Sequence, residues 1–228
     1  MARLARIVVP DLPHHVTARG NRREPIFFED GDQEIYLDHL AEQMRKAKVE
    51  VWAYCMMPNH VHLILCPATA DGMGKALGAA HRRWANFVNA RGRWRGHLFD
   101  GRYASVAMDE AHLLTAIRYV ALNPVRARLA RRAEDWRWSS VHTHLSGRDD
   151  GLVTVRPVLD RVDRFADLIA TDPDDPAFAA LRSAETTGRA LGSSDFVADL
   201  ERRLGRPIAR RAPGRKPAAT ATDQPALL

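Results

Sequence analysis

The order of apolar patterns along the chain predicts an α+β fold of the ferredoxin-like type, with one additional helix after the last strand. Runs that alternate apolar and polar residues, typical of strands, take turns with runs that repeat every three to four residues, typical of helices. Over the first 125 residues the order is strand, helix, strand, strand, helix, strand, helix, which contains the β-α-β-β-α-β unit. We expect residues 1–128 to form this domain, residues 129–205 a partly helical extension, and residues 206–228 a basic, disordered tail.

The first strand is expected to begin near His14, in "HHVTARG". Residues 32–48 follow as a helix, because Ile35, Leu40 and Met44 recur at helical spacing after an acidic start. Two strands come next, "VEVWAYCM" and "HVHLILC", separated by the turn residues "MPN".

The second half of the unit reads in the same way. Residues 74–89 predict a helix, and "HLFDGRYASVAM" predicts a further strand. Asp109 is a suitable N-cap for the last helix. We expect that helix to end at Asn123, because Pro124 disfavours a helical conformation of the residue before it.

The chain changes character after residue 130. "DWRWSSVHTHL" predicts a packed extension, in which Trp136 and Trp138 are more typical of core than of stacking residues. Residues 194–204 predict a helix that Gly205 closes. The remainder is rich in Pro, Ala and Arg, a composition typical of disorder.

The charge balance is basic and comes almost wholly from arginine. The formal net charge is +6, the sequence pI is about 9.8, and only four of the 34 cations are lysines. Guanidinium groups match the geometry of phosphates, which favours a nucleic-acid partner. A bias toward GC-rich codons would also raise the arginine content, and composition alone leaves both explanations open.

Localisation follows from what the sequence does not contain. Cys55 and Cys66 lie in apolar, strand-like runs and are typical of core residues in a reducing compartment. No apolar stretch approaches the roughly 18 residues of a membrane span, and the start does not have the form of a signal peptide. We therefore expect a cytoplasmic protein without a membrane partner.

Two histidines at spacing two stand in the strand "HVHLILC". Strand alternation places Val61, Leu63 and Leu65 on one face and His60 and His62 on the other. Two imidazoles on one face of a strand suit a divalent metal. The same dipeptide pattern is also common in half-exposed strands, so the metal hypothesis needs further residues.

The helix "DEAHLLTAIRYVALNP" supplies those residues. At about 100° per residue, Leu113, Ile117 and Val120 form an apolar stripe and Tyr119 lies on the opposite side, with Asn123 one turn later. A lone tyrosine there would be a partly exposed one. An amide oxygen next to the phenol favours a metal site instead.

A phenol beside a metal indicates nucleophilic attack on phosphorus. The ordinary pKa of tyrosine is about 10, so little phenolate exists at neutral pH unless nearby cations favour it. Attack on a phosphodiester would produce a covalent phosphotyrosine, which divides one difficult step into two.

The same segments resemble a known family. "PNHVHLIL" together with "RYVALNPVRA" is similar to the single-tyrosine His-hydrophobe-His (HUH) transposases of the IS200-like family, which act on single-stranded DNA. "HHVTARGNRREPIFF", "HLFDGRYASV", "WRWSSV" and "TGRALGSSDFVADLERRLGR" extend the resemblance to their REP-associated branch, over about residues 10–217.

The resemblance implies a ferredoxin-like catalytic domain that uses Mg²⁺ or Mn²⁺ and forms a 5′-phosphotyrosine intermediate with a free 3′-hydroxyl. By this analogy Tyr119 is the nucleophile and His60 and His62 are metal ligands. Related transposases often carry a glutamine four residues after the tyrosine. Asn123 occupies that place here with a shorter side chain, and it would ligate the metal, hold a water or cap the helix. The implied partner is single-stranded DNA folded into palindromic hairpins.

Basic and aromatic residues offer a surface for such DNA. Stacking faces beside guanidinium groups are what a single-strand groove requires. Trp94 lies in a polar loop, where stacking and packing are equally plausible, and Trp84 is expected in the core. A solvated surface remains the alternative for the cations. The DNA-binding candidates are Arg19, Arg22, Arg23, Arg82, Arg83, Trp94, Arg102, Arg206, Arg210, Arg211, Arg215 and Lys216.

The leading hypothesis is thus a metal-dependent single-strand nuclease and strand transferase, acting in the cytoplasm at the bacterial nucleoid. A DNA-binding regulator with the same fold and little catalysis is the second. A small relaxase or replication initiator is the third, and a zinc hydrolase the fourth. The sequence leaves open whether a homodimer forms, and whether Tyr119 acts within its own subunit.

Overall fold

The computed structural model describes residues 5–209, which form an antiparallel four-stranded sheet covered by helices on both faces. The strands are β1 (His14–Arg19), β2 (Val49–Met57), β3 (His60–Pro67) and β4 (Ala104–Ala107). Their order in the sheet is β2-β3-β1-β4, and each neighbouring pair is antiparallel. This is the sheet of the ferredoxin-like fold, and the predicted order of elements over the first 125 residues is confirmed.

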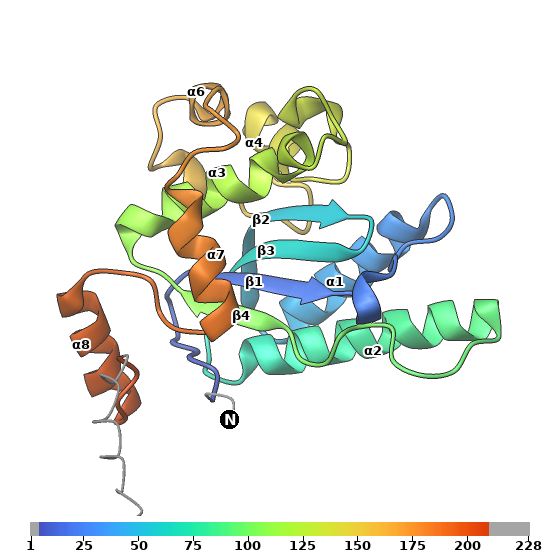
Figure 1. Ribbon diagram of the computed structural model, residues 1–228, viewed down its shortest axis with the longest axis horizontal. Helices are drawn as coiled ribbons and strands as arrows, with labels where there is room; N and C mark the ends of the chain where they lie inside the picture. The colour runs from blue at the N-terminus through green and yellow to red at the C-terminus, as the bar shows by residue number, and fades with distance from the viewer. Residues whose placement is uncertain (1–4, 210–228) are drawn as a thin grey trace, which may run out of the picture.

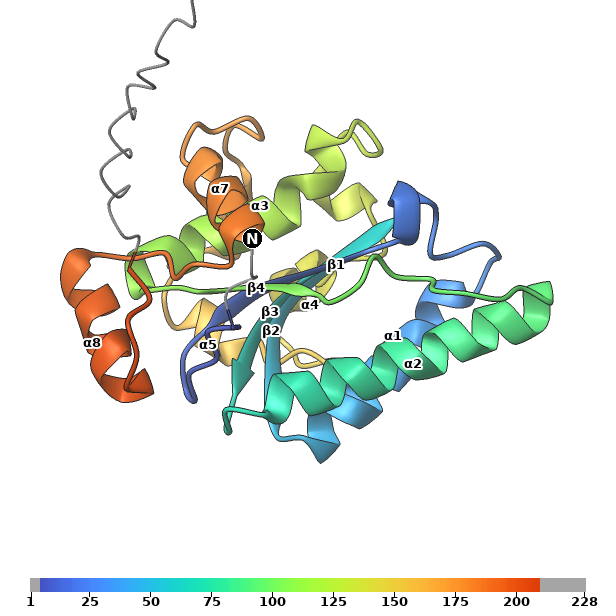
Figure 2. The ribbon, with the colours of Figure 1, turned by 60° about the horizontal axis from the view of Figure 1, so that its bottom comes forward.

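Two long helices, α1 (Asp32–Lys46) and α2 (Gly72–Gly92), cover one face (Figures 1 and 2). Helix α3 (Glu110–Arg126) lies across the other face. The apolar strand residues Val61, Leu63 and Leu65 are buried in the core on the α1–α2 side. Ile64 belongs to the core on the α3 side, so the predicted alternation of β3 is confirmed.

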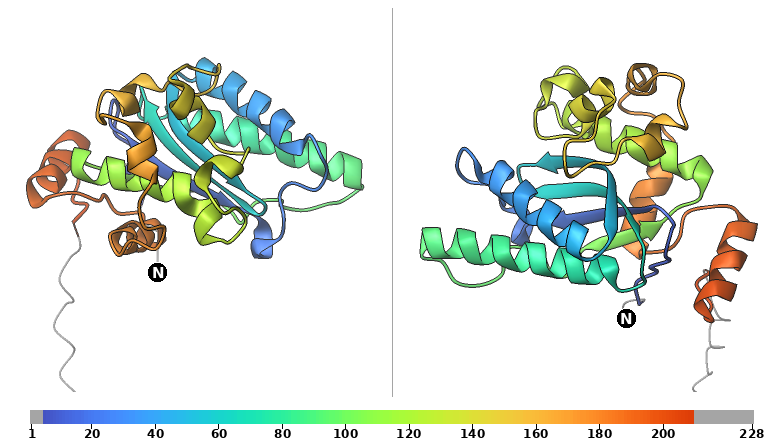
Figure 3. Two further views of the ribbon diagram at one scale, coloured as in Figure 1. Left: turned by 90° about the horizontal axis from the view of Figure 1, so that it is seen from above. Right: turned by 180° about the vertical axis from the view of Figure 1, so that it is seen from behind.

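Most of the chain after α3 packs around that helix, whereas α8 packs against the N-terminal segment (Figure 3). The core on this side includes Val141, Val158, Phe165 and Phe178, and a third cluster joins Leu200 to Ile7 near the N-terminus. The elements are η2 (Ala133–Asp135), α4 (Val141–Ser146), α5 (Arg156–Leu159), α6 (Phe165–Ile169), α7 (Phe178–Thr187) and α8 (Ser194–Leu204). The last of these has the predicted bounds, and Gly205 follows it at φ 60°, the left-handed conformation that closes a helix.

The predicted boundaries of three helices are wrong. Helix α1 ends at Lys46 rather than residue 48, and α2 extends beyond residues 74–89 at both ends. Helix α3 continues through Pro124 to Arg126. The proline lies in the last turn, where the carbonyl oxygens of Asn123 and Pro124 still accept hydrogen bonds from Ala127 and Leu129.

The strand predicted over residues 97–108 is also shorter, because only residues 104–107 are regular. Gly101 adopts φ 67° and turns the chain out of the sheet. The residues before it remain attached: Leu98 accepts a hydrogen bond from the Asn21 amide, and the Asp100 amide donates to Arg19. Asn21 begins the short helix η1 (Asn21–Arg23). This attachment holds the loop after α2 against the end of β1.

Two smaller expectations also hold. Trp84 is fully buried and donates from Nε1 to the carbonyl of Ile26. Trp136 packs against the α3-side core and donates to the carbonyl of Met56, as a packing residue should. Neither Cys55 nor Cys66 forms a disulfide. Within residues 5–209 no helix has the length and apolar character needed to cross a membrane.

Candidate active site

Antiparallel pairing sets polar side chains of β1 opposite the two histidines of β3. Thr17 pairs with His62, and Arg19 pairs with His60. Because paired residues in adjacent strands point to the same face, His15, Thr17 and the two histidines all face α3. The rings of His60 and His62 are perpendicular, with 4.8 Å between their centroids.

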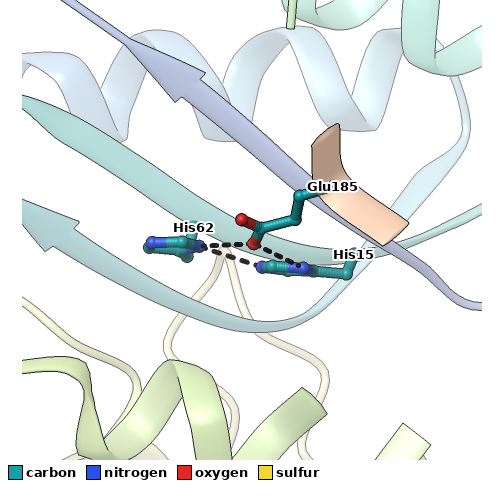
Figure 4. Close-up of side chains that lie close together, drawn as sticks. All are labelled: His15, His62 and Glu185. Atoms are coloured by element: carbon teal, nitrogen blue, oxygen red, sulfur yellow. Dashed lines mark hydrogen bonds and ion pairs between the residues drawn. The ribbon is translucent and has the colours of Figure 1, made fainter. Parts of the chain in front are cut away.

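His62 is buried in a polar cluster (Figure 4). Its Nδ1 lies 2.9 Å from Nε2 of His15 and 3.3 Å from the hydroxyl of Thr17. Glu185, from α7, reaches the same cluster: its Oε1 is 3.2 Å from Nδ1 of His15 and accepts a hydrogen bond from Thr17 at 3.3 Å. The rings of His15 and His62 are parallel to within 6°.

His60 has a separate polar partner in the turn that precedes β3. Its Nδ1 lies 2.7 Å from Oδ1 of Asn59. The amide nitrogen of Asn59 donates to the carbonyl of Arg23 at 2.8 Å. This second bond identifies the atom facing His60 as the amide oxygen, so the His60 Nδ1 carries the hydrogen and Nε2 keeps its lone pair.

Burial keeps these imidazoles neutral. It lowers the pKa of His60 to about 4 and that of His15 to about 3, and it holds the pKa of His62 well below its ordinary value. A neutral imidazole has a free lone pair, which is the form that binds a metal. Burial acts in the opposite direction on the neighbouring carboxyl and raises the pKa of Glu185 to about 7.

Tyr119 lies against both rings. Its ring is perpendicular to that of His62 at 5.5 Å and to that of His15 at 5.8 Å. The prediction that Tyr119, opposite the apolar stripe of the helix, is not a core residue is wrong, since only 6% of it is exposed. Phe178 of α7 covers the tyrosine with an edge contact at 5.4 Å, and no property of α3 itself could reveal this cover.

The pKa of Tyr119 is raised, mainly by burial and also by the nearby Glu185 carboxylate. Arg126 opposes this shift from about two turns further along α3, where its guanidinium lies over the tyrosine ring. Asn123 is buried on the same helix, and its amide nitrogen has no hydrogen-bond partner among the described residues. The Asn123 side chain can therefore form a further polar contact.

Sequence reasoning missed two members of this site, His15 and Glu185. Together with His62 they form a group whose potential ligand atoms lie within 4.8 Å of one another. His15 could have been found, because it shares a face with Thr17 in an alternating strand. Glu185 could not, since it arrives from a short helix of the extension.

The described DNA-binding candidates are spread over several surfaces. Arg19, Arg22 and Arg23 are exposed at the end of β1, where Arg22 and Arg23 adopt positive φ. Arg82 and Arg83 are exposed on α2, and Arg83 pairs with Glu42. Arg102 is exposed before β4. Arg206 donates to backbone carbonyls of Ala5 and Arg6. Arg210, Arg211, Arg215 and Lys216 lie outside the described residues.

Trp94 forms the most exposed aromatic surface, with 52% of the residue accessible. Phe28, also exposed, meets it edge to face at 5.0 Å. The indole packs so closely on Gly92 that a Cβ there would approach the ring to 2.7 Å. Trp94 is therefore held in place while one face stays open.

Comparison with known proteins identifies the family to which the chain belongs. The sequence profile of the family "Transposase IS200 like" matches residues 8–123, which span β1 to Asn123 and include both histidines and Tyr119. The chain belongs to the IS200-like transposases. It is accordingly an enzyme, a transposase, as the resemblance of its motifs implied.

One solved structure supports the fold. A REP-associated tyrosine transposase bound to a REP hairpin superposes with a TM-score of 0.57 at 20% identity, over 77% of this chain and 94% of that one. A candidate transposase of Deinococcus radiodurans is 23% identical over 51% of this transposase and 93% of its own chain, with a TM-score of 0.38. No curated protein matches the sequence.

Proposed function

We propose that the transposase cleaves and rejoins single-stranded DNA at palindromic hairpins, with Tyr119 as the nucleophile and Mg²⁺ or Mn²⁺ as cofactor. The observation that carries the proposal is the contact of the Tyr119 ring with His62, within a site of neutral imidazoles. Attack of the phenolate oxygen on phosphorus would form a 5′-phosphotyrosine and release a 3′-hydroxyl.

The residues present fit a divalent cation. His60 and His62 offer two neutral imidazoles on one face of β3, and Asn123 is buried on α3 with its amide nitrogen unbonded in the described structure. We assign His60 and His62 as ligands, with the Asn123 oxygen as the third. When bound, the cation would neutralise phosphate oxygens and stabilise the leaving 3′-oxygen.

The DNA surface is proposed from exposed cations beside the same end of the sheet. Arg19 ends β1, Arg22 and Arg23 follow it, and the loop carrying Trp94 is hydrogen-bonded to this segment. Guanidinium groups would hold backbone phosphates while the indole stacks on an unpaired base. The hairpin bound to the structurally similar REP-associated transposase supports a hairpin substrate here. Such a substrate would place the protein at the bacterial nucleoid.

The test uses a hairpin oligonucleotide with a fluorophore at its 3′ end, because a 5′-phosphotyrosine retains the 3′ fragment. Incubation with Mg²⁺ or Mn²⁺ and denaturing electrophoresis should show a labelled protein adduct. The Tyr119→Phe variant should form no adduct. Tyr103→Phe, at the residue directly before β4, should behave as wild type. An adduct that survives Tyr119→Phe contradicts the nucleophile assignment. Tight hairpin binding without any adduct would favour the regulator.

A further inference from the structure

We propose that His15, Thr17 and Glu185 are positioning residues that hold His62 in the tautomer with hydrogen on Nδ1 and a free lone pair on Nε2. The inference rests on the proposed function, since that lone pair is the one offered to the divalent cation. It assigns the His15–His62–Glu185 cluster a role as a hydrogen-bonded relay behind the metal ligand rather than as the ligand set.

Polar atoms surround Nδ1 of His62. Two polar atoms lie within reach, Nε2 of His15 at 2.9 Å and Oγ1 of Thr17 at 3.3 Å. Two neutral imidazoles can share only one hydrogen between facing nitrogens, so one ring donates and the other accepts. The direction is decided by the groups beyond them.

Both routes end on the same carboxylate oxygen. Thr17 donates its hydroxyl hydrogen to Oε1 of Glu185, which leaves the Thr17 oxygen as an acceptor toward His62. Nδ1 of His15 is buried, has no well-aligned hydrogen-bond partner, and lies 3.2 Å from the same Oε1. An ionised carboxylate only accepts hydrogen bonds. The negative charge of that oxygen, 3.2 Å away, favours the hydrogen of His15 on Nδ1, which leaves Nε2 as the acceptor.

The outcome for His62 is the same by either route: its Nδ1 is the donor. Its Nε2 then carries the lone pair, and within residues 5–209 that nitrogen has no hydrogen-bond partner. Figure 4 shows this edge of the ring directed away from Glu185.

The parallel rings argue against a cation between His15 and His62. With the planes only 6° apart, the two facing nitrogens point at each other, as in an N–H···N hydrogen bond. Ligand lone pairs must instead converge on a third point. The cation is thus expected on the far side of His62, next to His60.

Asn59 fixes the tautomer of His60, as His15, Thr17 and Glu185 fix that of His62. Its amide oxygen accepts from Nδ1 of His60, and its amide nitrogen is tied to the carbonyl of Arg23. Both histidines consequently present Nε2, in agreement with the general rule that a metal-binding imidazole donates its other N–H to an acceptor. The two rings differ only in the source of the acceptor: a neighbouring turn for His60, and the distant helix α7 for His62.

The test is nitrogen NMR of the metal-free full chain labelled with ¹⁵N-histidine, recorded at pH 8. Long-range proton–nitrogen correlation distinguishes the two tautomers, and His62→Gln identifies the resonance. We expect His62 to be protonated at Nδ1. Added Zn²⁺, a diamagnetic probe, should shift Nε2 of His62 and leave the nitrogens of His15 unbound.

Glu185→Ala should convert His62 to a mixture of tautomers and weaken Mn²⁺ binding, measured from the electron paramagnetic resonance of free Mn²⁺, by about 10- to 100-fold. Glu185→Gln keeps the shape of the side chain and so controls for loss of packing. Its tautomer ratio and Mn²⁺ affinity should lie between those of the wild type and of Glu185→Ala. Thr186→Ala, an exposed change on the same helix, should alter neither quantity.

A wild-type His62 protonated at Nε2, Zn²⁺ coordination by His15, or an unchanged tautomer in Glu185→Ala would each overturn the proposal. Failure of the Tyr119 adduct would not, because the tautomer and the Mn²⁺ affinity are measured without DNA. Conversely, a normal adduct with the wrong tautomer would leave the proposed function intact and remove the relay.

Discussion

The guanidinium of Arg126 lies over the ring of Tyr119, with 4.9 Å between the guanidinium carbon and the ring centroid. The two residues are seven positions apart on α3, so the helix itself sets the contact. Arg126 favours the phenolate more strongly than the other nearby cation, Arg182, within surroundings that otherwise raise the pKa of Tyr119 through burial and through Glu185.

Arg126→Gln should therefore raise the pKa of Tyr119 further and slow adduct formation. Below its pKa the phenolate fraction rises about tenfold per pH unit, and the variant's pH–rate profile should be displaced to higher pH. Burial lowers the pKa of His60 to about 4 and that of His15 to about 3, so neither contributes a step between pH 6 and 9. Glu185, with a pKa raised to about 7, ionises within this range in the wild type and the variant alike, so only the displacement between the two profiles reports on Arg126. Single-turnover cleavage across this range is the measurement. Arg131→Gln, an exposed change, should leave the profile in place.

Trp94→Ala should weaken binding of hairpins that carry unpaired bases by about 5- to 150-fold, because one stacked base contributes about 1–3 kcal/mol. The free energy of unfolding should change little, since the residue is half exposed. Fluorescence anisotropy with a hairpin bearing a single-stranded flank measures the effect. A blunt hairpin of the same stem is the control, and an equal loss of affinity for both would remove Trp94 from base stacking.

Deleting residues 210–228 should reduce the salt dependence of DNA binding. For single strands each lost phosphate contact lowers the slope of log K against log salt by about 0.7. Arg206 should stay in the shortened chain, because it bonds the backbone of Ala5 and Arg6, and Ile208 belongs to the third core cluster. Binding titrations at several salt concentrations provide the slope. An unchanged slope would exclude Arg210, Arg211, Arg215 and Lys216 from phosphate contact.

Leu63→Ala should destabilise the fold by about 2–5 kcal/mol, the usual range for a large-to-small change in a packed core. Leu63 is fully buried on the α1–α2 side of β3, and its neighbours on this face, Val61 and Leu65, belong to the same core. Urea unfolding measures the loss. Leu129→Ala, at a position that is 45% exposed, should cost less than 1 kcal/mol.

Local patterns were sufficient for the sheet and for the face of β3 that carries His60 and His62, because strand alternation depends only on neighbouring residues. They failed where distant segments decide. Tyr119 appeared open because its cover, Phe178, comes from α7. The end of α3 was misplaced because hydrogen bonds from Ala127 and Leu129 support the turn that contains Pro124. Glu185 carried no signal, since a single acid in a short helix has no periodicity to mark it.

The contact between His15 and Glu185 joins residues 170 positions apart. A chain emerges from the ribosome N-terminus first, and its segments begin to fold as they appear. His15, His62 and Tyr119 are thus all synthesised well before the carboxylate that completes their surroundings. The site reaches its final form only late in translation, so an interrupted chain that ends after α3 would carry the tyrosine and both histidines of β3 without the acid behind them.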